Sequence, residues 1–328
     1  MQQEKTDIKS MNLDELKSYM ASSFDEMTNL SKSLQEKLKK ECHFVSLKQE
    51  AVQVSKLDGT RKYLFALDDG NVIESVLMRY KHGNSVCISS QVGCRMGCRF
   101  CASTLDGLVR GLTPSEMLDQ IYRITRDTGE RVANVVVMGT GEPMDNFDNL
   151  LKFIELLTDE NGLNISQRNV TVSTCGIVPK MRELADKKLQ ITLALSLHAS
   201  SQEKRLELMP VANKYEIHEV IEACRYYFEQ TGRRVTFEYS LVGGVNDTEE
   251  DVRRLVDLIH GMNCHVNLIP VNPIKERSYV QPDHEAILNF KNRLEKNAIN
   301  VTIRREMGRD IDGACGQLRK RYISHAER

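Results

Sequence analysis

The chain has 328 residues, a formal net charge of −1 and a hydrophobic fraction of 41%. This composition allows one large domain with a sizeable core, and the near-neutral charge limits any nucleic-acid surface to a local patch. No apolar run approaches the roughly 20 residues of a membrane span. The N-terminus carries no apolar signal core, and nine cysteines without a secretion signal favour a reducing compartment. We therefore expect a cytoplasmic protein without a membrane segment.

The first 84 residues divide into a helical part and a β part. Apolar residues recur at helical spacing within residues 1–41, for example at Leu30, Leu34 and Leu38. Short strand-like runs follow within residues 42–84, with Asp58-Gly59 and Asp69-Gly70 between them. Asp-Gly is a strong hairpin signal because both turn positions need positive φ. We predict an antiparallel β-meander that leads into the first strand of the core.

From Ser85 onward, strands and helices alternate in about six βα units. The expected strands are 86–88, 135–138, 170–173, 191–196, 235–239, 266–269 and 301–303, and the expected helices are 114–128, 150–157, 179–186, 217–229, 249–262 and 285–296. Parallel strands with helices outside indicate an α/β fold, here a partial (β/α)6 TIM-type barrel that is open on one side. We place the barrel at residues 85–318 and a basic C-terminal tail at 319–328.

Three cysteines lie together directly after the first core strand. Cys94, Cys98 and Cys101 follow the spacing C-x3-C-x2-C, and three thiolates on one loop can hold three corners of a cubane iron–sulfur cluster. Without a fourth protein ligand, one iron would stay open for a small molecule. Zinc is an alternative, but structural zinc sites usually take four ligands, often from two C-x2-C pairs, and only one such pair exists here. Chance clustering is a further alternative in a chain with nine cysteines.

Polar residues follow several later strands. In such barrels the active-site residues lie at the carboxyl ends of the strands. Glycines let a backbone approach a ligand closely, and a buried carboxylate can bind an ammonium group. Singly, each residue could be a turn residue, but together they fit one ligand that crosses the barrel mouth. The candidates are Gly141, Glu142, Ser173, Ser196, Leu197, His198 and Asn272.

Two further cysteines need separate readings. Cys315 lies in a polar, glycine-flanked loop and is therefore a candidate for an exposed, reactive thiol. Cys87 alternates with apolar neighbours on a strand, where a free cysteine is commonly a core residue. Basic residues near the Cys315 loop could hold nucleic-acid phosphates or form a solvated tail; they are Arg304, Arg305, Arg309, Arg319, Lys320 and Arg321.

Taken together, these motifs resemble the RlmN/Cfr family of radical S-adenosylmethionine (SAM) enzymes, over about residues 22–320. The matching segments are Cys87–Cys94, the cysteine loop, Gly141-Glu142-Pro143, Ser196–Ala199, Val271-Asn272-Pro273 and the Cys315 loop. The resemblance implies a [4Fe-4S] cluster on Cys94, Cys98 and Cys101, and SAM contacts from the seven strand-end candidates. It also implies that Cys315 carries a methyl group, that Cys87 is its resolving partner, and that Glu74 accepts a proton.

The activity that the resemblance implies is methylation of C2 of an adenosine in 23S rRNA, at the peptidyl-transferase centre. The adenosine 3′ of a tRNA anticodon would be a second substrate. Carbon C2 has no acidic proton, so a direct polar transfer from SAM has no nucleophile to use. The implied route uses two SAM molecules: one methylates Cys315, and the other yields a radical that activates the S-methyl group. Cys87 then frees the product through a transient disulfide with Cys315.

Two rival functions stay open. A Cfr-like C8 methyltransferase shares the cysteines, but typically reads Gly-Glu-Ala where this chain has Gly141-Glu142-Pro143, which favours C2. A non-catalytic RNA-binding protein with a structural metal or cluster would not need the Cys315 loop. The family usually has a longer N-terminal helical domain that helps to dock RNA, with about one more helix than precedes Ala21 here. We expect a monomer that receives electrons from a flavodoxin or ferredoxin.

Overall fold

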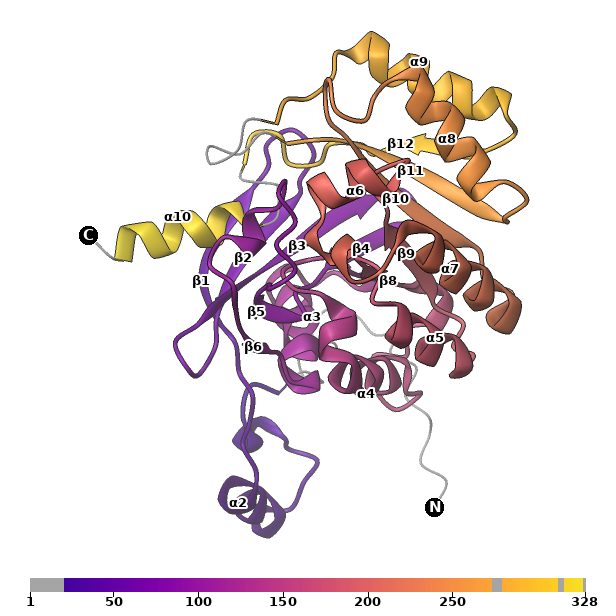
Figure 1. Ribbon diagram of the computed structural model, residues 1–328. Coiled ribbons are helices and arrows are strands. Elements are labelled where there is room, and N and C mark those ends of the chain that lie inside the picture. Colours follow the sequence, from indigo (N-terminus) through magenta and orange to yellow (C-terminus); the bar gives the residue numbers. More distant parts are fainter. Residues whose placement is uncertain (1–20, 273–278, 312–315, 327–328) are drawn as a thin grey trace.

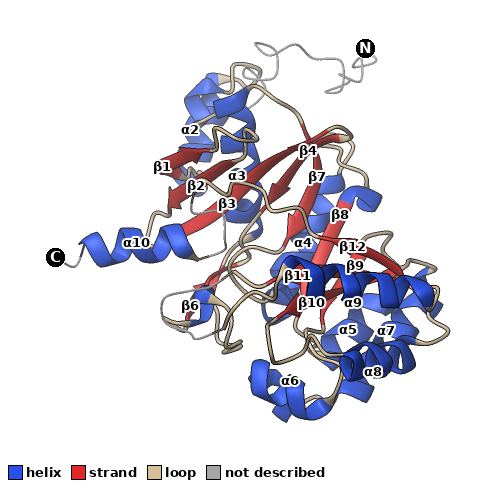
Figure 2. Cartoon of the chain, turned by 90° about the horizontal axis from the view of Figure 1, so that it is seen from above, coloured by secondary structure: helices blue, strands red, loops and turns tan. Residues whose placement is uncertain are grey.

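The computed structural model describes residues 21–272, 279–311 and 316–326. Within them the core is one ten-stranded sheet, in which the strands follow one another from β1 to β12 in the order β1-β2-β3-β4-β7-β8-β9-β10-β11-β12 (Figures 1 and 2). The strands are β1 (Lys48–Val54), β2 (Arg61–Ala66), β3 (Val72–Tyr80), β4 (Gly83–Cys87), β7 (Val132–Val137), β8 (Val170–Thr174), β9 (Thr192–Ser196), β10 (Val235–Leu241), β11 (Cys264–Pro270) and β12 (Asn300–Ile303). A separate pair joins β5 (Gln91–Gly93) to β6 (Leu108–Gly111).

The sheet confirms the α/β prediction. Strands β1 to β4 pair antiparallel, as the predicted meander requires, and every pair from β4 to β12 is parallel. Six helices connect the parallel strands: α3 (Pro114–Thr128), α4 (Phe147–Thr158), α5 (Val178–Asp186), α7 (Ile217–Thr231), α8 (Glu249–Ile259) and α9 (His284–Lys296). Among the described residues β1 and β12 remain unpaired edges, so the barrel is partial and open, as predicted.

Local sequence explains where these elements begin. Thr113 caps α3 in a capping box with Glu116, Pro114 occupies the first turn, and Gly129 ends the helix with φ +67°. One apolar stripe of α3, including Ile121 and Ile124, is fully buried against the sheet. The helices cover only the outer face of the sheet with their apolar stripes. The inner face is therefore free to form a site.

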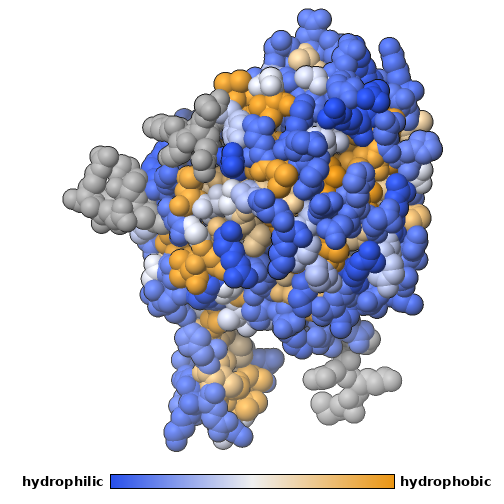
Figure 3. Space-filling view, viewed as in Figure 1, coloured by the Kyte–Doolittle hydropathy of each residue, from blue (hydrophilic) through white to orange (hydrophobic). Residues whose placement is uncertain are grey.

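Two of the described helices on the N-terminal side of α7 lie outside the regular βα repeat. The short α6 (Gln202–Leu208) follows β9 and was not predicted, since seven residues are too few to show a helical period. The predicted N-terminal helical segment is represented by α2 (Lys32–Glu41), which projects from the body and has no buried residue. Figure 3 shows that this projecting part carries apolar atoms on one side, and Leu34 is among the exposed apolar residues.

The predicted basic tail forms α10 (Gln317–Ala326), which packs on β3. Arg319 was expected among the candidate phosphate contacts, and that expectation is wrong. Its side chain is buried and donates to the Val72 carbonyl at 3.1 Å and to Asp106 at 3.3 Å. None of the described helices has the length and apolar character needed to cross a membrane.

Candidate active site

One cavity of about 240 Å³ brings most of the predicted site residues together at the carboxyl ends of the parallel strands. It is lined by all three cysteines of the loop and by Gly141, Glu142, Ser173, Ser196, His198 and Asn272. Leu197 is the exception, because its side chain is fully buried in the apolar core. Its backbone N–H donates to the Glu238 carbonyl at 3.0 Å, so Leu197 can face the cavity only through its main chain.

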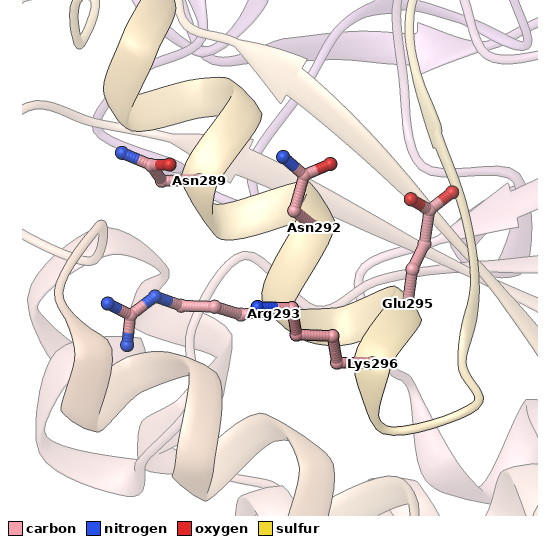
Figure 4. Close-up of a pocket in the computed structure, with 5 residues that line it drawn as sticks. All are labelled: Asn289, Asn292, Arg293, Glu295 and Lys296. Atoms are coloured by element: carbon pink, nitrogen blue, oxygen red, sulfur yellow. The ribbon is translucent and has the colours of Figure 1, made fainter.

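A larger hollow of about 840 Å³ runs along α9, but neither cysteines nor strand-end residues line it. Its walls are amide and charged side chains of one helix, namely Asn289, Asn292, Arg293, Glu295 and Lys296 (Figure 4). The smaller cavity is therefore the candidate site, because several strands contribute cysteines and polar groups to it.

The cysteine loop is fixed by its own backbone. Gly93 has φ +74°, and a Cβ there would lie 2.0 Å from the Gly107 carbonyl oxygen, so only glycine fits. The Cys94 N–H donates to that same carbonyl at 2.8 Å. The Thr104 hydroxyl lies 3.2 Å and 3.0 Å from the carbonyl oxygens of Cys98 and Cys101. The three thiols are thus presented to the cavity by a rigid loop.

The thiols of the cysteine loop are close to one another and largely buried. Burial raises the pKa of Cys94 to about 12, and the neighbouring Cys101 adds to the effect. Burial, with Cys101 and Cys94 nearby, also raises the pKa of Cys98. Among the described residues, no three His, Cys, Asp or Glu side chains converge on one metal ion. Three thiols that face one cavity from separate positions fit a cubane, in which each thiolate binds a different iron.

The Gly139–Glu142 turn forms the next wall of the cavity. A Cβ on Gly139 would lie 2.6 Å from the Ile88 carbonyl oxygen, so this turn packs directly against the end of the first core strand. Glu142 is buried and accepts the backbone N–H groups of Cys175 at 2.7 Å and Met144 at 3.0 Å. Burial raises the pKa of Glu142, and those N–H groups oppose the shift. Each carboxylate oxygen keeps acceptor capacity for a further donor.

The replacement of Gly141 by alanine is expected to destabilise the fold by about 2–6 kcal/mol, the sum of backbone strain and overpacking of about 1–3 kcal/mol each. Gly141 has φ +110°, and a Cβ would lie 2.6 Å from the Gln91 side chain and 2.8 Å from its backbone nitrogen. Urea unfolding measures the loss. Gly244→Ala is the matched control, because Gly244 has φ +72° in open space and should lose only about 1–2 kcal/mol. Equal losses would contradict the packing argument.

His198 is held in an unusual conformation beside the cysteine loop. Its φ is +55°, and its carbonyl accepts the Asn246 amide at 2.8 Å. Its Nδ1 accepts the Ser240 N–H at 2.9 Å, which assigns the ring proton to Nε2. Burial, with Arg205 nearby, lowers the pKa of His198 to about 3. The imidazole is therefore neutral at physiological pH, and Nε2–H is a fixed donor.

Sequence reasoning did not place several residues in the cavity lining: Phe100, Cys175, Met209, Glu238 and Ser240. Arg304, predicted as a phosphate contact, lines the cavity too. Glu238 carried a usable signal, as an acidic residue within the apolar run of β10. It pairs in register with Ser196 on one side and Asn267 on the other, so it faces the cavity beside Ser196. Asn267 donates to its Oε2 at 2.8 Å. Cys175 is both buried and part of the cavity wall.

Glu74 and Cys87 lie outside the cavity lining, and Cys315 lies outside the described residues. Glu74, on β3, is buried with Lys62, whose ammonium is 3.1 Å from Oε2. It also accepts the backbone N–H groups of Gly316 and Arg319, both at 2.6 Å. A Cβ on Gly316 would lie 2.9 Å from the Ser103 nitrogen, just after Cys101. Glu74 therefore holds the segment after Cys315 against the cysteine loop.

The replacement of Glu74 by leucine is expected to cost about 3–5 kcal/mol, because it leaves the buried Lys62 ammonium without its carboxylate. The double variant Lys62→Met/Glu74→Leu should recover part of that loss. Chemical denaturation of the single and double variants measures both effects. A double variant that is no more stable than Glu74→Leu would show that the ion pair is not the cause.

The open barrel, the cysteine loop and the polar strand ends together define a radical SAM enzyme. The sequence-family model of the Radical SAM superfamily matches residues 88–259 of this chain. A crystal structure of a radical SAM methyltransferase from Sphaerobacter thermophilus superposes with a TM-score of 0.86 at 38% identity, and the match covers 94% of this chain and 98% of that one.

Closer relatives define the family within that class. The protein of Lachnospira eligens described as a probable dual-specificity RNA methyltransferase RlmN is 67% identical, and the alignment covers 97% of each chain. The protein of the same description from Lachnoclostridium phytofermentans is 60% identical, over 97% of this chain and 96% of that one. This chain belongs to the RlmN family of radical SAM methyltransferases.

Proposed function

We propose that this protein methylates C2 of an adenosine in 23S rRNA, with the adenosine 3′ of a tRNA anticodon as a second substrate. The main support for the proposal is that the cysteine loop, the polar strand ends and the segment that follows Cys315 lie close together. The cysteine loop and the polar strand ends share one cavity, and Gly316, next to Cys315, packs against the end of the same loop. A cluster, a SAM site and a methyl-carrying thiol would thus lie side by side.

Cys94, Cys98 and Cys101 would hold a [4Fe-4S] cluster, and the cavity beside them would hold SAM. When bound, the pair supplies a 5′-deoxyadenosyl radical. Gly141, Glu142, Ser173 and Asn272 would orient SAM, as would the Ser196–His198 segment with its fixed Nε2–H donor. The buried walls would exclude water from the radical.

Two thiols would carry out the covalent steps, and one carboxylate would accept a proton. The Cys315 thiolate would take a methyl group from a first SAM, and a second SAM would activate that group for addition to C2. Glu74 would accept the C2 proton, and this role is supported by its hydrogen bonds to the backbone of Gly316 and Arg319, which follow Cys315 in the sequence. Cys87 would attack the Cys315 sulfur, break the bond from that sulfur to the methylated base, and release the product as a disulfide forms; a dithiol reductant would then return both cysteines to thiols. Two SAM molecules are thus consumed per methyl group.

The RNA would enter from the side of Arg304, which is exposed and lines the cavity. Arg305, Arg309 and Arg321 are exposed as well and would bind phosphates. The electron would come from a flavodoxin or ferredoxin, and the protein would act as a monomer with the accessory helical part, meander, barrel and tail at the boundaries expected from the sequence.

The direct test is anaerobic turnover of the reconstituted protein with a 23S rRNA fragment, followed by mass spectrometry of the digested nucleosides. We expect 2-methyladenosine, with one S-adenosylhomocysteine and one 5′-deoxyadenosine per methyl group. 8-Methyladenosine would instead assign the chain the C8 activity. RNA binding without SAM cleavage would support the non-catalytic alternative.

A further inference from the structure

Arg205, on α6, is a fully buried arginine with an incomplete set of partners. Its guanidinium donates from Nη2 to the Cys175 carbonyl at 2.6 Å and from Nη1 to the Tyr215 carbonyl at 3.4 Å. Its Nε is buried and has no hydrogen-bond acceptor in the described part of the chain. In that part of the chain no aspartate or glutamate forms an ion pair with it either. Arginine is almost never fully buried unless it is paired.

This unpaired cation lies directly behind the wall of the candidate active site. Cys175, which accepts from Nη2, lines the cavity. Met209, whose N–H donates to the Arg205 carbonyl at 2.7 Å, lines it too. The end of α6 is tied to the cysteine loop, because the Arg99 N–H donates to the Leu208 carbonyl at 2.9 Å. The charge is close enough to lower the pKa of His198 across the wall.

The physical cost of this arrangement points to a missing negative charge. A buried ion without a counter-charge is costly, and two carbonyl acceptors compensate it only in part. Among the described residues, the hydrogen-bond acceptors of the guanidinium are the two neutral carbonyls of Cys175 and Tyr215. Once the three loop cysteines bind iron as thiolates, the site carries a net negative charge. Reduction of the cluster by one electron makes that charge more negative by one unit.

We propose that Arg205 is the counter-cation of the iron–sulfur cluster. It balances the charge of the thiolates from behind the Cys175 wall and favours the reduced state. This inference rests on the cluster assignment under Proposed function. It makes Arg205 an electrostatic positioning residue rather than a ligand, because it does not line the cavity.

Two consequences separate this role from that of a structural bracket between α6 and Cys175. Cluster loading should stabilise the wild-type protein more than Arg205→Met, because only the wild type gains a charge pair on loading. The reduction potential of the cluster should also shift to a more negative value in Arg205→Met. Arg205→Lys keeps the charge and should retain both properties. If Arg205 only held α6 to Cys175, its replacement would lower the thermal midpoint of the metal-free and the loaded protein by the same amount.

The experiment measures thermal midpoints of metal-free and anaerobically loaded protein, iron and sulfide content, and the potential by dye-mediated titration without SAM. Arg233→Met is the control, since Arg233 donates to the Ile191 carbonyl and to the Thr192 hydroxyl at the start of β9, away from the cavity lining. We expect a smaller gain on loading and a more negative potential in Arg205→Met alone. If that variant fails to fold, Arg205→Gln, which keeps an amide donor for Cys175, replaces it.

An unchanged gain and potential in the neutral variants would overturn the proposal and leave Arg205 a structural bracket. A wild-type chain that binds no iron would overturn the cluster assignment itself. Loaded wild type with indistinguishable variants would leave that assignment intact, so the two failures are separable.

Discussion

Cys98→Ala is expected to abolish cluster formation and SAM cleavage. A cubane held by three thiolates from one loop loses a corner when any of them is removed. Changes to groups that merely support metal ligands already cost 10–100-fold, so we expect the 5′-deoxyadenosine yield to fall by more than about 100-fold. Iron and sulfide analysis after anaerobic reconstitution, with quantification of 5′-deoxyadenosine, measures both losses.

Two other cysteines provide the controls for this result. Cys42 is exposed and does not line the cavity, so Cys42→Ala should keep full cluster content. Cys175 lines the cavity beside the loop, and Cys175→Ala should also keep the cluster if one iron is open for SAM. Loss of the cluster in Cys175→Ala would reveal a fourth protein ligand and remove the coordination site that SAM needs.

Cys87→Ala is expected to stop the reaction after a single turnover, with RNA attached to the protein. Without Cys87, the proposed resolving thiol, the bond between the Cys315 sulfur and the methylated base would have no nucleophile to break it. Cys87 is buried at the end of β4. The change to alanine removes the thiol and leaves a small apolar side chain in the core. Mass spectrometry of tryptic peptides should find the adduct on Cys315, at no more than one methyl group per chain.

The control for the adduct is a change at a buried cysteine outside the cavity. Cys264 lies at the start of β11, buried, and Cys264→Ala should turn over repeatedly. Cys87→Ala/Cys315→Ala should form no adduct. Multiple turnovers in Cys87→Ala, or an unmodified Cys315 in iron-loaded protein supplied with SAM, would contradict the methyl-carrier route.

The barrel and most of the cavity could be predicted because they depend on local patterns. The βα alternation is a periodicity within each segment, and strand ends of a parallel sheet meet at one edge whatever the packing details. Cys94, Cys98 and Cys101 lie within eight residues of one another, so their proximity needs no fold at all. Hence six of the seven strand-end candidates lie in the cavity lining, and only Leu197 turns its side chain to the core.

Long-range packing decided the residues that the sequence could not assign. Arg319 reads as part of a basic tail, yet it is buried because Glu74, 245 residues away along the chain, holds the start of α10 on β3. Arg205 is one of many charged helix residues in the sequence, and only the docking of α6 behind Cys175 buries it, with no ion pair to a carboxylate among the described residues. Burial and the absence of a counter-charge are properties of the assembled neighbours.

The sequence alone therefore determined the chemistry that the protein contains: three thiols on a loop, glycine and acid at a strand end, and further cysteines outside that loop. These signals are short-range, so they are visible before folding. The tertiary structure decided which charges are desolvated, which backbone groups a buried carboxylate holds, and that Gly316 packs against the cysteine loop. Desolvation and contacts between distant segments exist only once the sheet has formed, which is why no local pattern could supply them.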